Sequence, residues 1–406
     1  MKKIRIDNVH NIINSISQFS IPCLFFALYA VYGNILAFNN EKYSLSYMYI
    51  CTVVIYMCIP LGLYLIFFKQ KSHIQINNLV LLILPLTYLI IQIAHTYKGY
   101  NGEWLTAFAV ICLFCLLSDR NKSIIFEYFY RIILITNAIS IILYVINLIF
   151  PRLFETVPYY SDQAVSLNLN YTKIGIFAIY GNRLCSIFNE PGGLGTICAF
   201  LFIITFRKST KLEKTILLVC GTLTFSLAFF ILIYVFFLVY LLQKNIRYFI
   251  PMLLLAILFF LIPYIDFHND AINMFVARMK IVNGSFAGNN RTTREFDYLY
   301  NEFKKTKEVF WGKGIGYSLS AGVATFKSYI VQMGFIGTGI FLVEWIVCAV
   351  IKANKSRFNY IILALFIISV YQRPNIPLTL TGYLIIFGGF AWQYERGNEE
   401  LDVYKS

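Results

Sequence analysis

The sequence predicts an all-α, polytopic integral membrane protein: a bundle of about twelve transmembrane helices in a single transmembrane domain, 1–406. Hydrophobic residues make up 59% of the chain and charged residues only 13%. Apolar runs long enough to cross a bilayer, which takes roughly 20 helical residues, recur from Phe19 almost to the C-terminus. Because so few charges cannot keep such a chain in water, a soluble domain is excluded.

The apolar runs define the helices in order. Their approximate spans are 19–38, 45–68, 77–95, 103–118, 129–150, 187–206, 212–225, 227–243, 248–264, 324–350, 358–372 and 376–393. The stretch 215–242 holds no charged residue. As one helix it would be about 42 Å long against a hydrocarbon core of about 30 Å, so two shorter helices that meet near Ser226 are the alternative.

Basic residues choose between these alternatives, because Lys and Arg gather in short cytoplasmic loops. They recur at the N-terminus and at every second loop: Lys2, Lys3, Arg5, Lys69, Lys71, Arg120, Lys122, Arg207, Lys208, Lys211, Lys214, Lys244, Arg247, Lys352, Lys355 and Arg357. The series continues to the end only if 215–242 crosses twice, so we take it as two helices. Both termini are then cytoplasmic, and the long connections 151–186 and 265–323 lie on the outer face.

The second outer connection contains an amphipathic segment. Between Arg294 and Phe310, the apolar residues Phe296, Leu299 and Phe303 recur at helical spacing among charged ones. We expect an amphipathic helix that lies on the membrane surface. The alternative is a loop helix that packs on the bundle.

The remaining composition limits the partners and cofactors. The formal net charge of +14 reflects the inner loops and an attraction to anionic membrane lipids. No contiguous basic domain offers a face for nucleic acid, so no nucleic-acid partner is expected. The four histidines are scattered, and the cysteines lie mostly inside apolar runs. We therefore expect no metal site and no cofactor.

Polar chemistry gathers where the chain enters the span 187–206. Arg183 and Glu190 lie there, followed by Pro191 and a glycine cluster. Charged groups at the mouth of a membrane helix are costly, which calls for a functional explanation. Glu190 is a candidate base for an attacking hydroxyl or a group that orients a sugar. Its structural alternative is a capping carboxylate or an ion pair, for example with Arg183.

Further cations fall in the segments that we place outside. They are Arg278, Arg291, Arg294, Lys327 and Arg373. Arginines that converge on one cavity would bind an anionic head group, because guanidinium groups bind phosphate oxygens in a bidentate manner and stay charged. A lipid diphosphate is the natural ligand. Alternatively, each arginine reaches the interface and pairs with a phospholipid.

These residues resemble the signature of a known family. Arg183-x4-Phe188-x-Glu190-Pro191-x3-Gly195, leading into a helix, is similar to the signature of the O-antigen and capsular polysaccharide polymerases, the Wzy-type repeat-unit polymerases related to the O-antigen ligases. Supporting features are Thr222-x-Thr224-x-Ser226, Trp311-Gly312-x-Gly314-x-Gly316, Gly334-x2-Gly337 and Arg373-Pro374. The motifs cover about 180–375.

The resemblance implies a membrane glycosyltransferase of the bacterial inner membrane that acts on its periplasmic face. It would transfer an oligosaccharide from undecaprenyl diphosphate to the non-reducing end of another lipid-linked repeat unit, with a chain-length-determinant protein as a possible partner. Arg183 and Arg291, with Glu190, would form the catalytic set. Arg278, Arg294, Lys327 and Arg373 would bind the diphosphate.

Two other functions remain open. Related ligases carry a histidine shortly after the glycine turn, whereas this chain has Lys327-Ser328 in that area, which favours a polymerase and leaves the base open. A flippase for lipid-linked oligosaccharides would also have about twelve helices and cationic cavities. It would be expected to show two comparable halves, and no internal repeat is apparent here.

Overall fold

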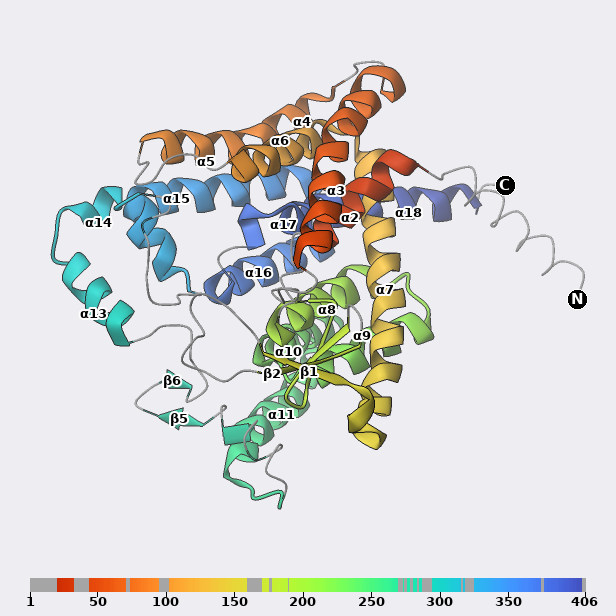
Figure 1. Cartoon of the computed structure of the whole chain (residues 1–406), viewed down its shortest axis with the longest axis vertical. Helices are drawn as coiled ribbons and strands as arrows, with labels where there is room; N and C mark the ends of the chain where they lie inside the picture. The colour runs from red at the N-terminus through yellow and green to blue at the C-terminus, as the bar shows by residue number, and fades with distance from the viewer. Residues whose placement is uncertain are drawn as a thin grey trace, which may run out of the picture.

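The protein is mostly helical in the computed structural model (Figure 1). The structure describes residues 20–32, 44–70, 74–94, 102–158, 170–174, 177–188, 190–268, 273, 276–277, 280–282, 285–286, 294–314, 317, 325–373 and 376–403.

The N-terminal helices follow the predicted apolar runs. They are α2 (Ile21–Tyr32), α3 (Ser44–Tyr64) with the π-helical turn η1 (Leu65–Lys69), α4 (Ile76–Leu79), η2 (Val80–Leu82), α5 (Ile83–Ala94), α6 (Gly102–Leu116) and α7 (Asp119–Ile149). The long helix α7 contacts α2, α9 and α18 and so links distant parts of the chain (Figure 1). It begins ten residues before the predicted span, where the Ser118 hydroxyl accepts a hydrogen bond from the Asn121 amide at 3.3 Å.

The predicted outer connection 151–186 contains an antiparallel sheet, so the all-α prediction is wrong here. Its elements are η3 (Pro151–Leu153), β1 (Glu155–Pro158), β2 (Asn170–Ile174), β3 (Phe177–Tyr180) and β4 (Arg183–Ser186), paired in sequence order. A small hairpin, β5 (Ile281–Val282) and β6 (Ser285–Phe286), lies in the second connection. Strands of two to five residues are too short for a periodic pattern to reveal them.

Helix α8 (Pro191–Thr205) lies deep in the bundle, and all its residues except Gly193 are buried. It packs against α9 (Lys211–Leu223) and α10 (Leu227–Lys244), which are followed by η4 (Ile246–Tyr248), α11 (Phe249–Leu261) and η5 (Ile262–Tyr264). The chain breaks between α9 and α10 at 224–226, where Phe225 has a φ of 46°. The prediction of two helices that meet near Ser226 is therefore confirmed.

The C-terminal elements pack against several of the earlier helices. They are α13 (Arg294–Phe303), α14 (Glu308–Trp311), α15 (Lys327–Lys352), α16 (Arg357–Gln372), η6 (Ile376–Leu378), α17 (Leu380–Tyr383), the π-helical η7 (Leu384–Gly388) and α18 (Gly389–Val403). The apolar face of α13, with Phe296, Tyr300 and Phe303, is buried against Ile330 and Val331 of α15. The amphipathic segment thus packs on the protein, which corrects the expectation that its apolar face lies in the membrane.

A close backbone contact fixes this connection to the bundle. Helix α15 is interrupted at Gly334, which has a φ of 68° and a ψ of 177°. The turn at Gly312 lies against the interruption, and the amides of Lys313 and Gly314 donate to the carbonyls of Val331 at 2.7 Å and Gln332 at 3.0 Å. A Cβ on Gly334 would be 2.2 Å from the carbonyl oxygen of Phe310, so only glycine fits.

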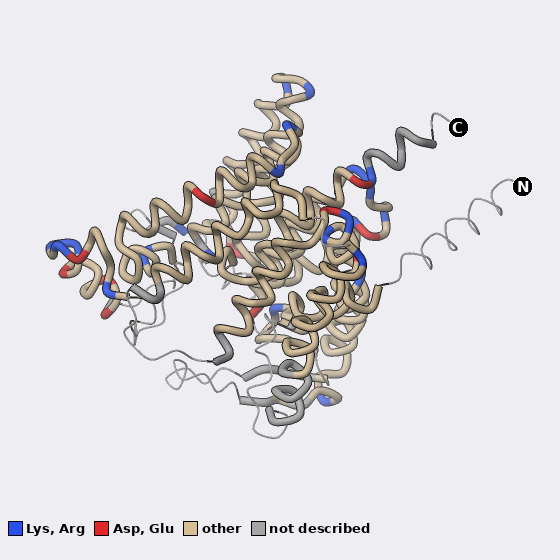
Figure 2. Tube along the Cα trace, turned by 90° about the horizontal axis from the view of Figure 1, so that it is seen from above, with Lys and Arg blue, Asp and Glu red and all other residues tan. Residues whose placement is uncertain are grey.

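The helices identify a membrane protein. Four are long and apolar enough to cross a bilayer: Asp119–Ile149, Leu227–Lys244, Ile246–Tyr264 and Lys327–Lys352. Shorter apolar helices surround them. Figure 2 shows the charged residues mainly at helix ends and turns, with long uncharged stretches between them. The number of crossings and the assignment of the outer face stay predictions.

Candidate functional site

The candidate site begins at the first residue of the buried helix α8. Glu190 is its N-cap, with an extended backbone, and Pro191 occupies the first helical position, where a missing amide proton costs nothing. The Glu190 side chain makes no capping hydrogen bond, and 45% of it is exposed. The carboxylate therefore does not cap the helix, as one of the structural alternatives supposed. It is directed instead to a partner elsewhere in the fold.

That partner is Arg373, at the C-terminal end of α16. Nη1 of Arg373 donates a hydrogen bond to Oε1 of Glu190, and the two residues form an ion pair. Arg183 is the partner suggested by proximity in the sequence, whereas the structure pairs Glu190 with a residue 183 positions away. Only 12% of the Arg373 side chain is exposed, and among the described residues its Nε and Nη2 atoms have no hydrogen-bond partner. Buried donors of this kind are rare and call for an explanation.

Arg183 lies on β4 and holds the break between α9 and α10. Its Nε donates to the carbonyl of Thr224 at 2.9 Å, and its Nη2 lies 3.4 Å from the carbonyl of Phe225. The same break packs on α8, because a Cβ on Gly195 would be 2.7 Å from Oγ1 of Thr224. The motif residues of three elements are thus brought together, and Arg183 positions them. Its predicted contact with a diphosphate stays a prediction.

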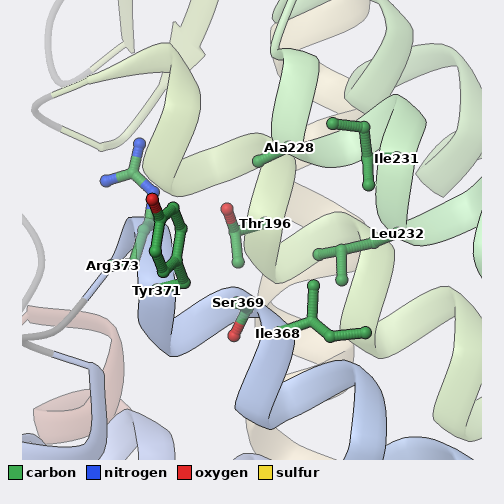
Figure 3. A pocket seen from close by; sticks show the side chains of 8 residues that line it. All are labelled: Thr196, Ala228, Ile231, Leu232, Ile368, Ser369, Tyr371 and Arg373. Carbon is green, nitrogen blue, oxygen red and sulfur yellow. The ribbon is translucent and has the colours of Figure 1, made fainter. Parts of the chain in front are cut away.

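An apolar cavity of about 370 Å³ opens beside Arg373. Its lining residues come from α8, α10 and the end of α16: Thr196, Ala228, Ile231, Leu232, Ile368, Ser369, Tyr371 and Arg373. Figure 3 shows Arg373 and Tyr371 at one end of this group and the aliphatic side chains of Ile231, Leu232 and Ile368 at the other. The cavity therefore joins a cationic end to a hydrocarbon lining, which suits a ligand with an anionic head and an apolar chain.

Lys327, the first residue of α15, follows Phe326, whose amide donates to the carbonyl of Tyr371 at 3.4 Å. Its Nζ atom is 3.1 Å from Oδ1 of Asp297 and 5.3 Å from the ring centroid of Tyr300. The neighbouring Phe326 stacks on Tyr371, with ring centroids 4.9 Å apart. Burial raises the pKa of the Tyr300 hydroxyl, and the nearby Lys327 partly offsets this shift. Lys327 is thus paired with α13 and lies close to the residues that lead to Arg373.

Three of the predicted arginines cannot be placed by their side chains. Arg278 and Arg291 lie outside the described residues, and Arg294 is described only as the first residue of α13. Sequence reasoning missed Thr196, Ser369 and Tyr371, which line the cavity. Ser369 lies one helical turn before Arg373, and the amide of Arg373 donates to the Ser369 carbonyl at 2.8 Å.

Comparison of the chain with protein-family models, with curated proteins and with solved structures found no match.

Proposed function

We propose that the protein polymerises lipid-linked oligosaccharide repeat units in O-antigen or capsule synthesis. It transfers the glycan from undecaprenyl diphosphate to the non-reducing end of another lipid-linked repeat unit. One observation carries the proposal: Arg373, whose side chain is only 12% exposed and is paired with Glu190, lies at the cationic end of the apolar cavity between α8, α10 and α16. An anionic head attached to a hydrocarbon chain matches both parts of this arrangement.

The free donors of Arg373 support a role in phosphate binding. Two of its nitrogens have no partner among the described residues, although the side chain is largely buried. A bound phosphate oxygen would satisfy them through charge-assisted hydrogen bonds, which are shorter and stronger than neutral ones. The ion pair with Glu190 holds the guanidinium at the mouth of the cavity, so no reorganisation is needed when the ligand binds.

The chemistry needs a positioned cation and a proton acceptor. An acceptor hydroxyl attacks the anomeric carbon of the donor glycan, a new glycosidic C–O bond forms, and the C–O bond to the lipid diphosphate breaks. The diphosphate leaves with the electron pair, and Arg373 stabilises its charge. Glu190, 45% exposed at the start of α8, takes the hydroxyl proton. The predicted residues Arg291, Arg278, Arg294 and Lys327 would complete the cationic surface.

The test is complementation of a strain that lacks the gene, with surface glycans separated on a gel beside an expression blot. We expect Glu190→Gln and Arg373→Met to lose the long-chain ladder while a single repeat unit is still displayed. Loss of a general base lowers a rate by roughly 10²–10⁴-fold. Arg291→Ala, tested in the same way, examines a residue whose placement the structure leaves open.

A control variant separates the chemistry from loss of protein. Arg152→Ala changes an exposed arginine in η3. It should keep the full ladder. A full ladder in the Glu190 and Arg373 variants would refute the site assignment. A deletion strain that displays no repeat unit at all would point to flipping or ligation.

A further inference from the structure

A second cavity, of about 720 Å³, lies in the connection between α11 and α15, apart from the lining of the first. One wall is the water-facing side of α13, where Glu295, Tyr298 and Glu302 follow each other at helical spacing. The opposite wall comes from Lys313 and Tyr317, next to the glycine turn. The volume falls within the roughly 300–1,000 Å³ typical of sites for small molecules.

The lining combines aromatic rings with both donors and acceptors of hydrogen bonds. The side chain of Tyr298 is 71% exposed. Nζ of Lys313 lies 5.2 Å from the ring centroid of Tyr317. Glu302 is paired with Lys305 on the surface, and Glu295 has no partner among the described residues. Two carboxylates disfavour an anionic ligand, whereas they accept hydrogen bonds from paired hydroxyl groups.

The chemistry of this lining fits a saccharide. A pyranose ring presents hydroxyl groups at its edge and C–H bonds on its faces. The C–H face packs on the negative face of an aromatic ring, and the hydroxyl groups bond to carboxylates and to ammonium groups.

A series of contacting side chains lies between the two cavities. Asp297 of α13 pairs with Lys327, and the adjacent Phe326 stacks on Tyr371 at the edge of the first cavity. The turn at Gly312, next to Lys313, is fixed by its hydrogen bonds to the interruption in α15. A ligand in the second cavity would therefore be held at a defined position relative to Arg373.

We propose that the cavity between α13 and Tyr317 binds the oligosaccharide part of a lipid-linked repeat unit, with Tyr298 as the stacking residue and Glu295 as a hydrogen-bond acceptor. This inference rests on the proposed function for the identity of the glycan. The lining of the cavity by itself points only to a short saccharide of a few sugar residues.

The test measures binding to the full-length protein purified in detergent. The probe is the repeat-unit oligosaccharide released by mild acid from the lipid-linked pool of the deletion strain, so no lipid contributes to affinity. We expect Tyr298→Ala and Glu295→Gln each to raise the Kd about tenfold, as the loss of one aromatic contact or one charged hydrogen bond would. Tyr298→Phe keeps the ring and should stay within twofold of the wild type.

Tyr264→Ala is the matched control, because Tyr264 is 69% exposed but lies in η5, outside the cavity. It should leave the Kd unchanged. Unchanged binding in Tyr298→Ala, or no binding to the wild type, would overturn this site while the ladder experiment still tests polymerisation. Conversely, a full ladder in the Glu190 variant together with weaker binding in Tyr298→Ala would keep the saccharide site and refute the polymerase.

Discussion

Two cations, the fully buried Lys122 in the first turn of α7 and the partly buried Arg373 at the end of α16, differ in how their hydrogen bonds are satisfied. Nζ of Lys122 donates to Oδ1 of Asn78 and to the carbonyl of Cys115, both at 2.9 Å, and lies 3.9 Å from Asp119. Asp119 also accepts from Lys352 at 2.8 Å. Arg373 has Glu190 as its ion partner and keeps two nitrogens unpaired within the described chain.

This difference indicates that Lys122 has a structural role and that Arg373 is a candidate for binding a ligand. A fully satisfied buried charge fastens elements together: here Lys122 and Asp119 join α7 to α4, α6 and α15. An arginine with two buried nitrogens that have no partner within the described chain retains the capacity to bind an anion. Removing the first should lower the stability of the fold, whereas removing the second should abolish activity and leave the stability nearly unchanged.

Lys122→Ala should have the largest effect. It removes the donor to Oδ1 of Asn78 and to the Cys115 carbonyl, whereas Asp119 keeps its ion pair with Lys352. Each buried acceptor left without a donor costs about 1–3 kcal/mol of unfolding free energy. Thermal unfolding of the purified protein in detergent measures this loss. Lys211→Ala, at an exposed position, is the control and should change stability by less than about 0.5 kcal/mol. Equal stability of both variants would remove the distinction between the two cations.

Arg373→Met tests whether Arg373 serves activity and contributes little to stability. Polymerisation should fall at least about 10²-fold, as on removal of a donor that stabilises charge in a transition state. The unfolding temperature should stay close to that of the wild type, because Arg373 contributes one ion pair to a half-exposed Glu190. The surface ladder and thermal unfolding are measured on the same variant. Loss of stability with normal specific activity would assign Arg373 a structural role.

Gly334→Ala tests whether the close backbone contact at Gly334, which involves no charged group, holds the connection 265–323 near Arg373. The conformation of Gly334 is nearly exclusive to glycine, and the added methyl group would collide with the Phe310 carbonyl. We expect a loss of about 1–3 kcal/mol. Gly339→Ala in the same helix is the control, since no atom lies within 4 Å of its added Cβ, and it should be neutral or stabilising. Similar unfolding temperatures for both variants would contradict this anchor.

Lys327→Ala should have the smallest effect on stability. Its ion pair with Asp297 is partly exposed on both sides, and such pairs contribute about 0.2–1 kcal/mol. Thermal unfolding and the glycan ladder together define its role. A shortened ladder at unchanged stability would support the predicted contact with the diphosphate, and an unchanged ladder would restrict Lys327 to its pairing with α13.

The positions of the helices were predictable because burial in a bilayer imposes a simple rule on composition. Each predicted apolar run is covered largely by helix, and the break near Ser226 followed from the charge pattern and the length limit. The β-sheet was missed because its strands are too short to show a period. The basic residues of the inner loops included Lys122, which the structure buries in the first turn of α7. The positive-inside rule counts charges along the chain and contains no information about the hydrogen-bond partners of a lysine.

The sequence by itself determined the class of molecule, the sites of its helices and the candidate residues Glu190 and Arg183. These follow from local composition, which fixes how each segment partitions between water and hydrocarbon. Only the tertiary structure decided that Glu190 pairs with Arg373, that Arg183 holds the break at 224–226, and that the apolar face of α13 is buried against α15. Such contacts join segments far apart in the chain and depend on how the helices pack, which no local pattern encodes.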